Sequence, residues 1–436
     1  MKKLIAAFLI LTALALLVAC AQNGAGDDTT AEDTTAASTT TEAVETDPPE
    51  EKKLILVEDG KTDFRVIRAE EATGYALETA TIVYRKLGTT LGVDFKFASD
   101  FRSPLEPDPT TAHEILLFST ERAESVAALA DLNFEGYIIR VTEHKIVIVG
   151  SSPAACNEAL YCFFDKIIPE HTENGTVVFP VGLEVKAECE SAPIDLRAAI
   201  AEGKSIGGDF EILFKYTGSG GFSTAQGVAT DGTHAYVVMK RKNGNKETGR
   251  IVKIDMATWQ VVMEGEELPL DHGNDMTYDP TTNRLIVVNM LNGIVSIVDP
   301  ETLALVEQPA LSFGTWGAGY IDGTEQYAFL ADYGLTITDT AFNVIRSAPL
   351  AGAEGYTGQG MDADAQFAYV PLSPNAGKST NIIQIYDIVT GEYLGIITVG
   401  TTMESESMFH VGNEYYIHFN SGGSKIAKIE FYVKFE

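Results

Sequence analysis

The pattern of apolar and polar positions divides the chain into an α/β region and a longer all-β region. Between residues 52 and 189, alternating runs such as KKLILV and FRVIRA predict strands, and they take turns with runs at helical spacing. Residues 72–92 place one apolar face along a predicted helix: Tyr75, Leu77, Ile82, Leu87 and Leu91. This order of elements predicts a small α/β (or α+β) domain over residues 52–189.

A hairpin and a helix close this predicted domain. Two alternating runs over residues 136–150 meet at Thr142–His144 and predict a hairpin. The second run leads into a helical segment in which Ser152 suits the N-cap and Pro153 the first helical position. Residues 190–209 then read as a polar connector, with a short helix expected around Leu196–Ile200.

From residue 210 the pattern changes to short strands separated by glycines and turn residues, and it repeats. Five segments align by their apolar positions at spacings of 48, 43, 42 and 47 residues. The equivalent positions are Gln226, Asn274, Gly317, Gln359 and Glu406. Units of this length with three or four short strands are typical of propeller blades. The fold class we expect is therefore multidomain: the α/β domain followed by an all-β five-bladed β-propeller over residues 210–436.

A second repeated series supports the same count. Each unit continues into two further strands with an acid at a matching position: Asp255, Asp299, Asp339, Asp387 and Glu430. The last unit ends after its third strand, whereas FEILFKYT, residues 210–217, stands alone before the first unit. We expect this segment to supply the missing outer strand, which would close the ring and cover its edge.

The amino terminus reads as an export signal with an anchor. Lys2 and Lys3 precede an apolar stretch from Leu4 to Leu17 that is short for a membrane span. The following Leu17-Val18-Ala19-Cys20 resembles the lipobox of bacterial lipoproteins. That resemblance implies cleavage after residue 19, lipidation of Cys20, and an extracytoplasmic chain held at a bacterial membrane. An ordinary secretory signal or a short anchor is the alternative.

Residues 20–51 predict a disordered tether, because they combine many threonines and nine acids with no Lys or Arg. When those acids and the two signal lysines are left out, the rest of the chain contains 53 acidic and 29 basic residues. A surface so acidic repels nucleic acid and anionic headgroups, so neutral or cationic partners are expected.

The remaining cysteines do not suggest a disulfide scaffold. Cys156 and Cys162 lie six positions apart on one predicted helix, too far along its axis for a disulfide. A bond from Cys189 to either of them stays open, although an odd number cannot pair completely. No CxxC motif is present, which argues against a metal–thiolate site.

Two stretches resemble known families. GYIIRVTEHKIVIVGSSPAACNEALYCFFDKII, residues 136–168, resembles the amino-terminal domain of α-glucuronidase-type glycoside hydrolases, which also occurs as an accessory module in bacterial surface proteins. No catalytic barrel follows here, so the resemblance implies only a carbohydrate context. FSTAQG, residues 222–227, is similar to the start of five-bladed plant-type glutaminyl cyclotransferases, with Gln226-Gly227 as the matching pair. The remainder resembles the general YVTN/NHL class of propellers.

The candidate ligand-binding residues lie where the chain enters each innermost strand. In propellers these loops gather at one mouth of the central channel, where amides and acids can hydrogen-bond sugar hydroxyls and a tryptophan can stack on a sugar ring. The alternative is that these side chains only hold neighbouring blades together. Asp279 is set apart as a turn residue. The candidate residues are Gln226, His272, Asn274, Asp275, Trp316, Gln359, Asp362, Glu404 and Glu406.

The sequence gives weaker indications of a cofactor or of catalysis than of ligand binding. Calcium held by Asp275, Asp362 and Glu406 is possible on oxygen count alone, and His272, His410 and His418 are the alternative metal ligands. Otherwise no cofactor is expected. The preferred hypothesis is a non-catalytic lipoprotein that binds a glycan or cell-envelope polymer. The alternatives are a propeller enzyme, either a glycan hydrolase or cyclotransferase-like, and a protein-interaction platform.

Overall fold

The computed structural model describes residues 51–102, 108–189, 194–243, 246–290, 292–332, 334–375, 377–378 and 380–436. The predicted signal sequence, Cys20 and all but the last residue of the predicted tether lie outside these residues. Glu51–Glu436 forms one compact unit. Within the described part of the chain, no helix has the length and apolar character needed to cross a membrane.

The amino-terminal region is built on a six-stranded mixed sheet with strand order β3-β2-β4-β6-β5-β9. Strands β3, β2, β4 and β6 run parallel, and β5 and β9 complete the sheet in antiparallel fashion. A small second sheet has the order β1-β8-β7. The strands are β1 Lys53–Val57, β2 Arg65–Arg68, β3 Lys96–Ser99, β4 Glu114–Leu117, β5 Gly136–Val141, β6 Lys145–Gly150, β7 Thr172–Glu173, β8 Thr176–Pro180 and β9 Glu184–Glu188.

Helices cover both faces of the larger sheet, because successive strand residues point to opposite sides. Ile115 packs in the cluster that contains helices α1 and α3, whereas Leu116 packs in the cluster that contains α2. Ser152 caps α3 by accepting from the Ala155 N–H, as the sequence predicts. The helices are α1 Gly74–Leu91, α2 Ala123–Asp131, α3 Pro153–Cys162, the π-helix η1 Phe163–Ile167 and α4 Ile168–Glu170. Cys156, Cys162 and Cys189 are free thiols.

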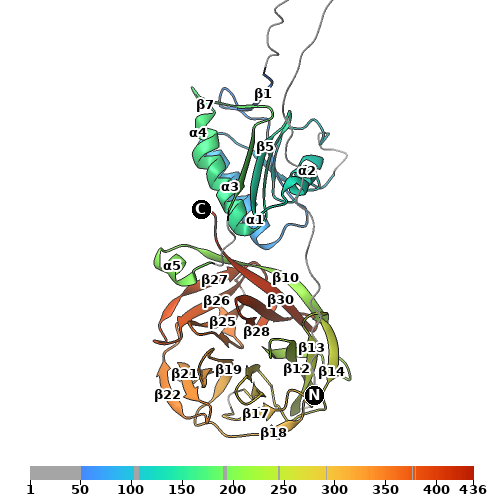
Figure 1. Ribbon diagram of the computed structural model, residues 1–436, viewed down its shortest axis with the longest axis vertical. Helices are drawn as coiled ribbons and strands as arrows, with labels where there is room; N and C mark the ends of the chain where they lie inside the picture. The colour runs from blue at the N-terminus through green and yellow to red at the C-terminus, as the bar shows by residue number, and fades with distance from the viewer. Residues whose placement is uncertain are drawn as a thin grey trace, which may run out of the picture. The chain divides into compact units, whose positions relative to one another are not determined.

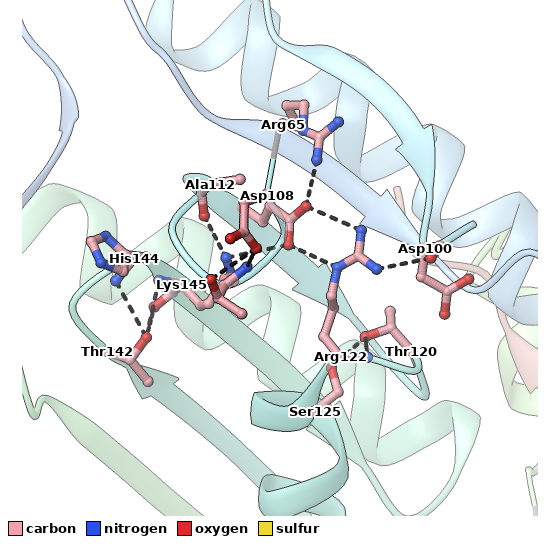
Figure 2. A network of polar contacts seen from close by, with 12 residues as sticks. Arg65, Asp100, Asp108, Ala112, Thr120, Arg122, Ser125, Thr142, His144 and Lys145 are labelled. Atoms are coloured by element: carbon pink, nitrogen blue, oxygen red, sulfur yellow. Dashed lines mark hydrogen bonds and ion pairs between the residues drawn. The ribbon is translucent and has the colours of Figure 1, made fainter. Parts of the chain in front are cut away.

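A buried ion cluster crosses this region (Figure 2). The Glu114 carboxylate is completely buried and lies 2.7 Å from the Arg65 guanidinium, 3.0 Å from that of Arg122 and 3.4 Å from the Lys145 amine. Arg122 also donates to the Asp100 carbonyl at 2.8 Å. Burial lowers the pKa of Lys145, and the Glu114 charge opposes that shift. Every charge in the cluster has a close partner, so it acts as a structural element.

The carboxy-terminal region is a β-propeller-type fold (Figure 1). Three sheets have four strands each, in chain order from the centre outwards. They are β11 Thr224–Thr230, β12 His234–Asn243, β13 Lys246–Asp255 and β14 Gln260–Glu264; β15 Asp275–Asp279, β16 Arg284–Val288, β17 Val295–Val298 and β18 Leu305–Glu307; and β19 Thr315–Tyr320, β20 Gln326–Ala331, β21 Gly334–Asp339 and β22 Val344–Ala348.

The last two sheets are joined through strand β10, which follows the short helix α5 at Leu196–Ala201. β10 pairs antiparallel with β30 along its length and parallel with β27 over three residues. The expected closing strand is therefore present. These strands are β10 Ile206–Tyr216, β23 Tyr356–Gly358, β24 Asp362–Ala363, β25 Phe367–Pro374, β26 Asn381–Asp387, β27 Tyr393–Val399, β28 Glu404–Val411, β29 Glu414–Asn420 and β30 Ser424–Val433.

The innermost strands form a closed cycle. β11 contacts β15, β15 contacts β19, β19 contacts β24, β24 contacts β28, and β28 contacts β11. Neighbouring strands run in the same direction: Asp275 meets Ala318 and Thr277 meets Tyr320, both at an offset of 43 residues. The amino ends of all these strands therefore lie at one mouth of the central channel and the carboxyl ends at the other.

The repeated turn acids serve the backbone, as their position predicts. Asp255, Asp299, Asp339 and Asp387 each accept from main-chain N–H groups two to four residues further along. Asp279 does the same with Thr281 and Thr282, and it also accepts from the Tyr327 hydroxyl at 2.6 Å. These are Asx-type turns that fix blade corners. Glu430 differs because it lies within β30.

The end of the chain returns to the amino-terminal core. Tyr432 and Phe435 are buried in the same cluster as Tyr75, whose ring meets that of Tyr432 edge-on at 4.9 Å. The Asn157 amide donates to the Val433 carbonyl at 2.6 Å. The α/β core therefore includes side chains from the last residues of the sequence.

Candidate functional site at the propeller channel

Residues with polar side chains or main-chain carbonyls gather at the amino ends of the innermost strands, and hydrogen bonds link several of them. We call this end the amino-end mouth and define it by Gln226, Asn274, Trp316, Gln359, Glu404 and Glu406. The Asn274 amide donates to the Trp316 carbonyl at 2.6 Å and to the Gln359 carbonyl. The Gln359 amide donates to Glu404 at 3.1 Å. The sequence therefore brings residues from distant blades to one place.

Asn420 extends this network to the first blade. Its amide donates to Glu404 at 3.0 Å, and its carbonyl accepts from the Ala225 N–H at 3.4 Å. Asn420 lies on β29, the second strand of its blade. Sequence reasoning missed it, because only positions on innermost strands were considered. Asn420 ends β29, which pairs antiparallel with β28, so it lies opposite Glu404 at the amino end of β28. This pairing is the sequence feature that predicts its place at the mouth.

Asp275 lies one layer deeper and ties four blades together. Its carboxylate accepts from the Ala318 N–H at 2.8 Å, the Met361 N–H at 2.9 Å and the Ser407 hydroxyl at 2.6 Å. Burial raises the pKa of Asp275 well above its ordinary value, and these hydrogen bonds oppose that rise. Both carboxylate oxygens already have donors, so Asp275 supports the site from below.

Above Asp275, several buried acceptor oxygens have no donor. The side chains are nearly or completely inaccessible: Gln226 is 3% exposed, Asn274 1% and Glu406 0%. Among the described residues, none donates to Gln226 Oε1, Asn274 Oδ1 or either carboxylate oxygen of Glu406. We call these three residues the acceptor cluster. Buried acceptors without donors are costly, so this cluster favours a bound group that supplies donors or positive charge.

The surroundings of Glu406 also disfavour its negative charge. Burial raises the pKa of its carboxyl well above the ordinary value, and the charge of the neighbouring Glu404 adds to the rise. Asn420 and Lys240 oppose it, although the Asn420 amide makes its hydrogen bond with Glu404. His418, buried beside this mouth, is kept neutral because burial lowers its pKa to about 4.

Trp316 and His272 border the mouth, and part of each side chain already contacts other residues of the protein. The Trp316 ring is partly buried and packs against the hydrophobic cluster around Leu330 and Met361. His272 lies 2.8 Å from Glu247 and 3.1 Å from the Lys240 amine. Burial and the Lys240 charge lower the pKa of His272. Only the remaining exposed surface of either ring can meet a ligand.

Asp362 does not join the amino-end mouth. Its carboxylate lies 2.7 Å from His410 at the opposite end of the channel, and His410 lies 2.9 Å from Asp322. The innermost strand of this blade is interrupted between β23 and β24, where Gly360 passes Asp275 so closely that a side chain would not fit. Asp362 lies three positions beyond Gln359 along the chain, so it lies deeper in the channel than the mouth residues.

The residues considered for metal binding are likewise separated. Asp275 is enclosed by donors, Asp362 is paired with His410, and Glu406 remains at the other mouth. His418 bonds to Ser424 at 2.9 Å, while His272 pairs with Glu247. In the part of the chain that the structure describes, no three His, Cys, Asp or Glu side chains are grouped to hold a metal ion.

Comparison with known proteins gives only remote structural likenesses. The chain is similar to Myxococcus xanthus glutaminyl cyclase, with 12% identity over 53% of this chain and 98% of that one and a TM-score of 0.40. It is also similar to Kuenenia stuttgartiensis hydrazine synthase (13% identity, 45% of this chain and 55% of that one, TM-score 0.30) and to the Neurospora crassa Pan2 WD40 domain (12%, 48% and 64%, TM-score 0.26). No family model and no curated protein matches the chain.

Proposed function

We propose that this protein is a non-catalytic binding protein whose propeller holds a carbohydrate-type ligand at the amino-end mouth. The acceptor cluster carries the proposal. Its oxygens need donors, and a sugar presents several hydroxyl donors on a compact ring. The amides of Gln359 and Asn420 and the partly exposed Trp316 provide the mixed polar and aromatic border that such ligands favour.

Binding at this mouth is tested with residues 51–436, which form one compact unit. A glycan array would identify ligands, and titration calorimetry would measure the best of them. Glu406→Gln places an amide donor among the acceptors, so we expect at least tenfold weaker binding. Glu325→Gln is the matched control, because it removes the same charge from an exposed position.

Two outcomes would contradict this proposal. One is a complete lack of glycan binding by the folded protein. The other is binding that Glu406→Gln leaves unchanged, which would place the ligand elsewhere. Trp316→Leu provides a second test, because it removes ring stacking while leaving the carbonyl that accepts from Asn274.

We further propose that the protein acts outside the cytoplasm of a bacterial cell, attached to the membrane by a lipid on Cys20. The lipobox-like sequence before Cys20 and the acidic tether after it support this. Cells that express Cys20→Ser should no longer incorporate a fatty-acid label into the protein. Labelling of that variant at the wild-type level would rule out this anchor.

A glycan hydrolase is the second candidate, and one observation favours it. Glu406 has a raised pKa and lies near the exposed Glu404, and glycosidases use two neighbouring carboxyl groups of which one has a raised pKa. Turnover of the glycans that bind, lost in both Glu404→Gln and Glu406→Gln, would replace the binding proposal with this one. We expect binding without turnover.

A further inference from the structure

A separate cavity occupies the opposite end of the channel. Its volume is about 190 Å³. It is lined by the carboxyl halves of the innermost strands and the residues that follow them, and none of the amino-end mouth residues takes part. We call it the carboxyl-end pocket.

The inner part of this pocket is apolar. Val228, Met276, Ala318, Met361 and Met408 line it, and each comes from a different blade. Thioether side chains are polarisable and adapt their shape to a ligand. Phe409 adds an aromatic residue to the lining. The pocket therefore offers apolar contact to a compact group.

Two tyrosines line the pocket nearer its opening. Both phenol groups are held by neighbours: the Tyr278 hydroxyl donates to Asn283 at 2.9 Å, and the Tyr320 hydroxyl donates to the Thr324 carbonyl. Tyr320 also stacks edge-on with Tyr327 at 5.9 Å. These contacts fix the two rings in place before any ligand arrives.

The charges around the pocket are mainly negative. His410 bridges Asp362 and Asp322 at 2.7 and 2.9 Å. Burial would lower the pKa of His410, but the two carboxylates raise it to about 11, so the imidazolium offsets only one of them. Asp231 supplies another negative charge, and no Lys or Arg is among the described lining residues.

We propose that the carboxyl-end pocket is a second binding site, for a small organic cation with a quaternary-ammonium-type head. The combination of an apolar, sulfur-rich inner part, fixed tyrosine rings and a net negative border matches such a cation. Aromatic faces attract alkylammonium groups, and their methyl surface suits the methionines. A phosphate or carboxylate ligand would meet repulsion from the same border.

The test uses choline and its uncharged isostere 3,3-dimethylbutan-1-ol with residues 51–436 in titration calorimetry. We expect choline to bind at least tenfold more tightly than the isostere, because shape is equal and only charge differs. Asp322→Asn should weaken choline binding several-fold, whereas the charge-matched Glu325→Gln should not. Equal binding of the two probes, or no choline binding, would overturn the proposal.

The tyrosine contribution is tested independently of folding. Tyr320→Phe keeps the ring and loses only the hydroxyl, so choline binding should persist. Tyr320→Leu removes the ring and should weaken choline binding about tenfold, with thermal unfolding confirming that both variants are folded. If Tyr320→Leu binds choline as the wild type does, the cation does not occupy this pocket. Because Glu406→Gln lies at the other mouth, it should not affect choline binding.

Discussion

Glu114 and Glu406 are both completely buried, but their surroundings are opposite. In the α/β region, Glu114 is surrounded by three cations within 3.4 Å. In the propeller, neither carboxylate oxygen of Glu406 receives a hydrogen bond from the described residues. A buried charge whose partners are all present contributes to the fold, whereas a buried carboxyl without partners indicates a place for a ligand.

The largest loss in the free energy of unfolding is expected from Glu114→Gln. The change leaves Arg65, Arg122 and Lys145 buried with a neutral amide as their only shared acceptor. Removing one partner from a buried ion cluster costs about 3–5 kcal/mol. Urea unfolding followed by helical circular dichroism reports on this region, because α1 to α4 belong to it. A loss below about 1 kcal/mol would mean that the cluster is not a structural element.

The second largest loss of stability is expected at Asp275, which lies beneath the acceptor cluster and has hydrogen-bond donors on both carboxylate oxygens. Asp275→Ala leaves the Ala318 and Met361 N–H groups without this acceptor and leaves the Ser407 hydroxyl with its long 3.4 Å contact to the Met408 carbonyl. We expect a loss of about 2–3 kcal/mol, because unmet buried donors cost roughly 1–3 kcal/mol each and water will reach some of them. Tryptophan fluorescence follows the change, since Trp259 and Trp316 both lie in the propeller. Asp275→Asn keeps one acceptor oxygen and should cost less; equal losses would contradict the assigned role.

Part of this arrangement follows from the sequence. The repeat spacing located the innermost strands, and Asn274, Gln359 and Glu404 do meet at one mouth, because the innermost strands of a ring surround a common axis. The turn acids were also predictable, since Asx-turns depend on local backbone geometry. Contacts between adjacent strands of one blade, such as that of Asn420, depend on strand register, which the apolar pattern alone does not specify.

The sequence does not predict the position of Asp362 or the carboxyl-end pocket, because both depend on how far along the channel a residue lies. The Met361 N–H meets the same Asp275 oxygen as the Ala318 N–H, so the neighbouring Asp362 lies at a deeper level than the strand starts. The repeat alignment at the strand starts does not include Asp322 or His410, because these residues lie after or near the ends of their strands. Their partnership depends on side chains from two blades reaching across the channel, which only the assembled ring specifies.

A third, smaller loss of stability is expected when His410 is replaced. Like Glu114, His410 has close partners of opposite charge, Asp322 and Asp362. The His410 pKa is raised from 6.5 to about 11, so the charged form stabilises the folded state. That stabilisation is fully present below pH 6.5 and is lost as the pH rises towards 11. His410→Gln should therefore cost about 2 kcal/mol at pH 5.5 and less at pH 9, measured by urea unfolding. A cost that does not depend on pH would show that the imidazolium is not formed.

The smallest effect on stability is expected from Glu406→Gln at pH 5, and its pH dependence has the same direction as that of His410→Gln, because both groups have a raised pKa in the folded state. The pKa of Glu406 is raised above its ordinary value of 4.5, so the folded state holds the proton more tightly than the unfolded chain. Wild-type stability should then fall, relative to the variant, as the pH rises above 4.5. Near pH 5 the two should differ by less than about 1 kcal/mol, since a neutral carboxyl and an amide are similar in size and polarity.

The matched pair of substitutions therefore separates the two buried glutamates. Glu114→Gln should destabilise the protein at neutral pH, whereas Glu406→Gln should be neutral at pH 5 and increasingly stabilising at higher pH. The second result requires that no donor or cation already occupies the acceptor cluster in the purified protein. If Glu406→Gln is instead destabilising at every pH, a group that remains bound through purification must satisfy those oxygens, and mass spectrometry of the native protein would detect its additional mass.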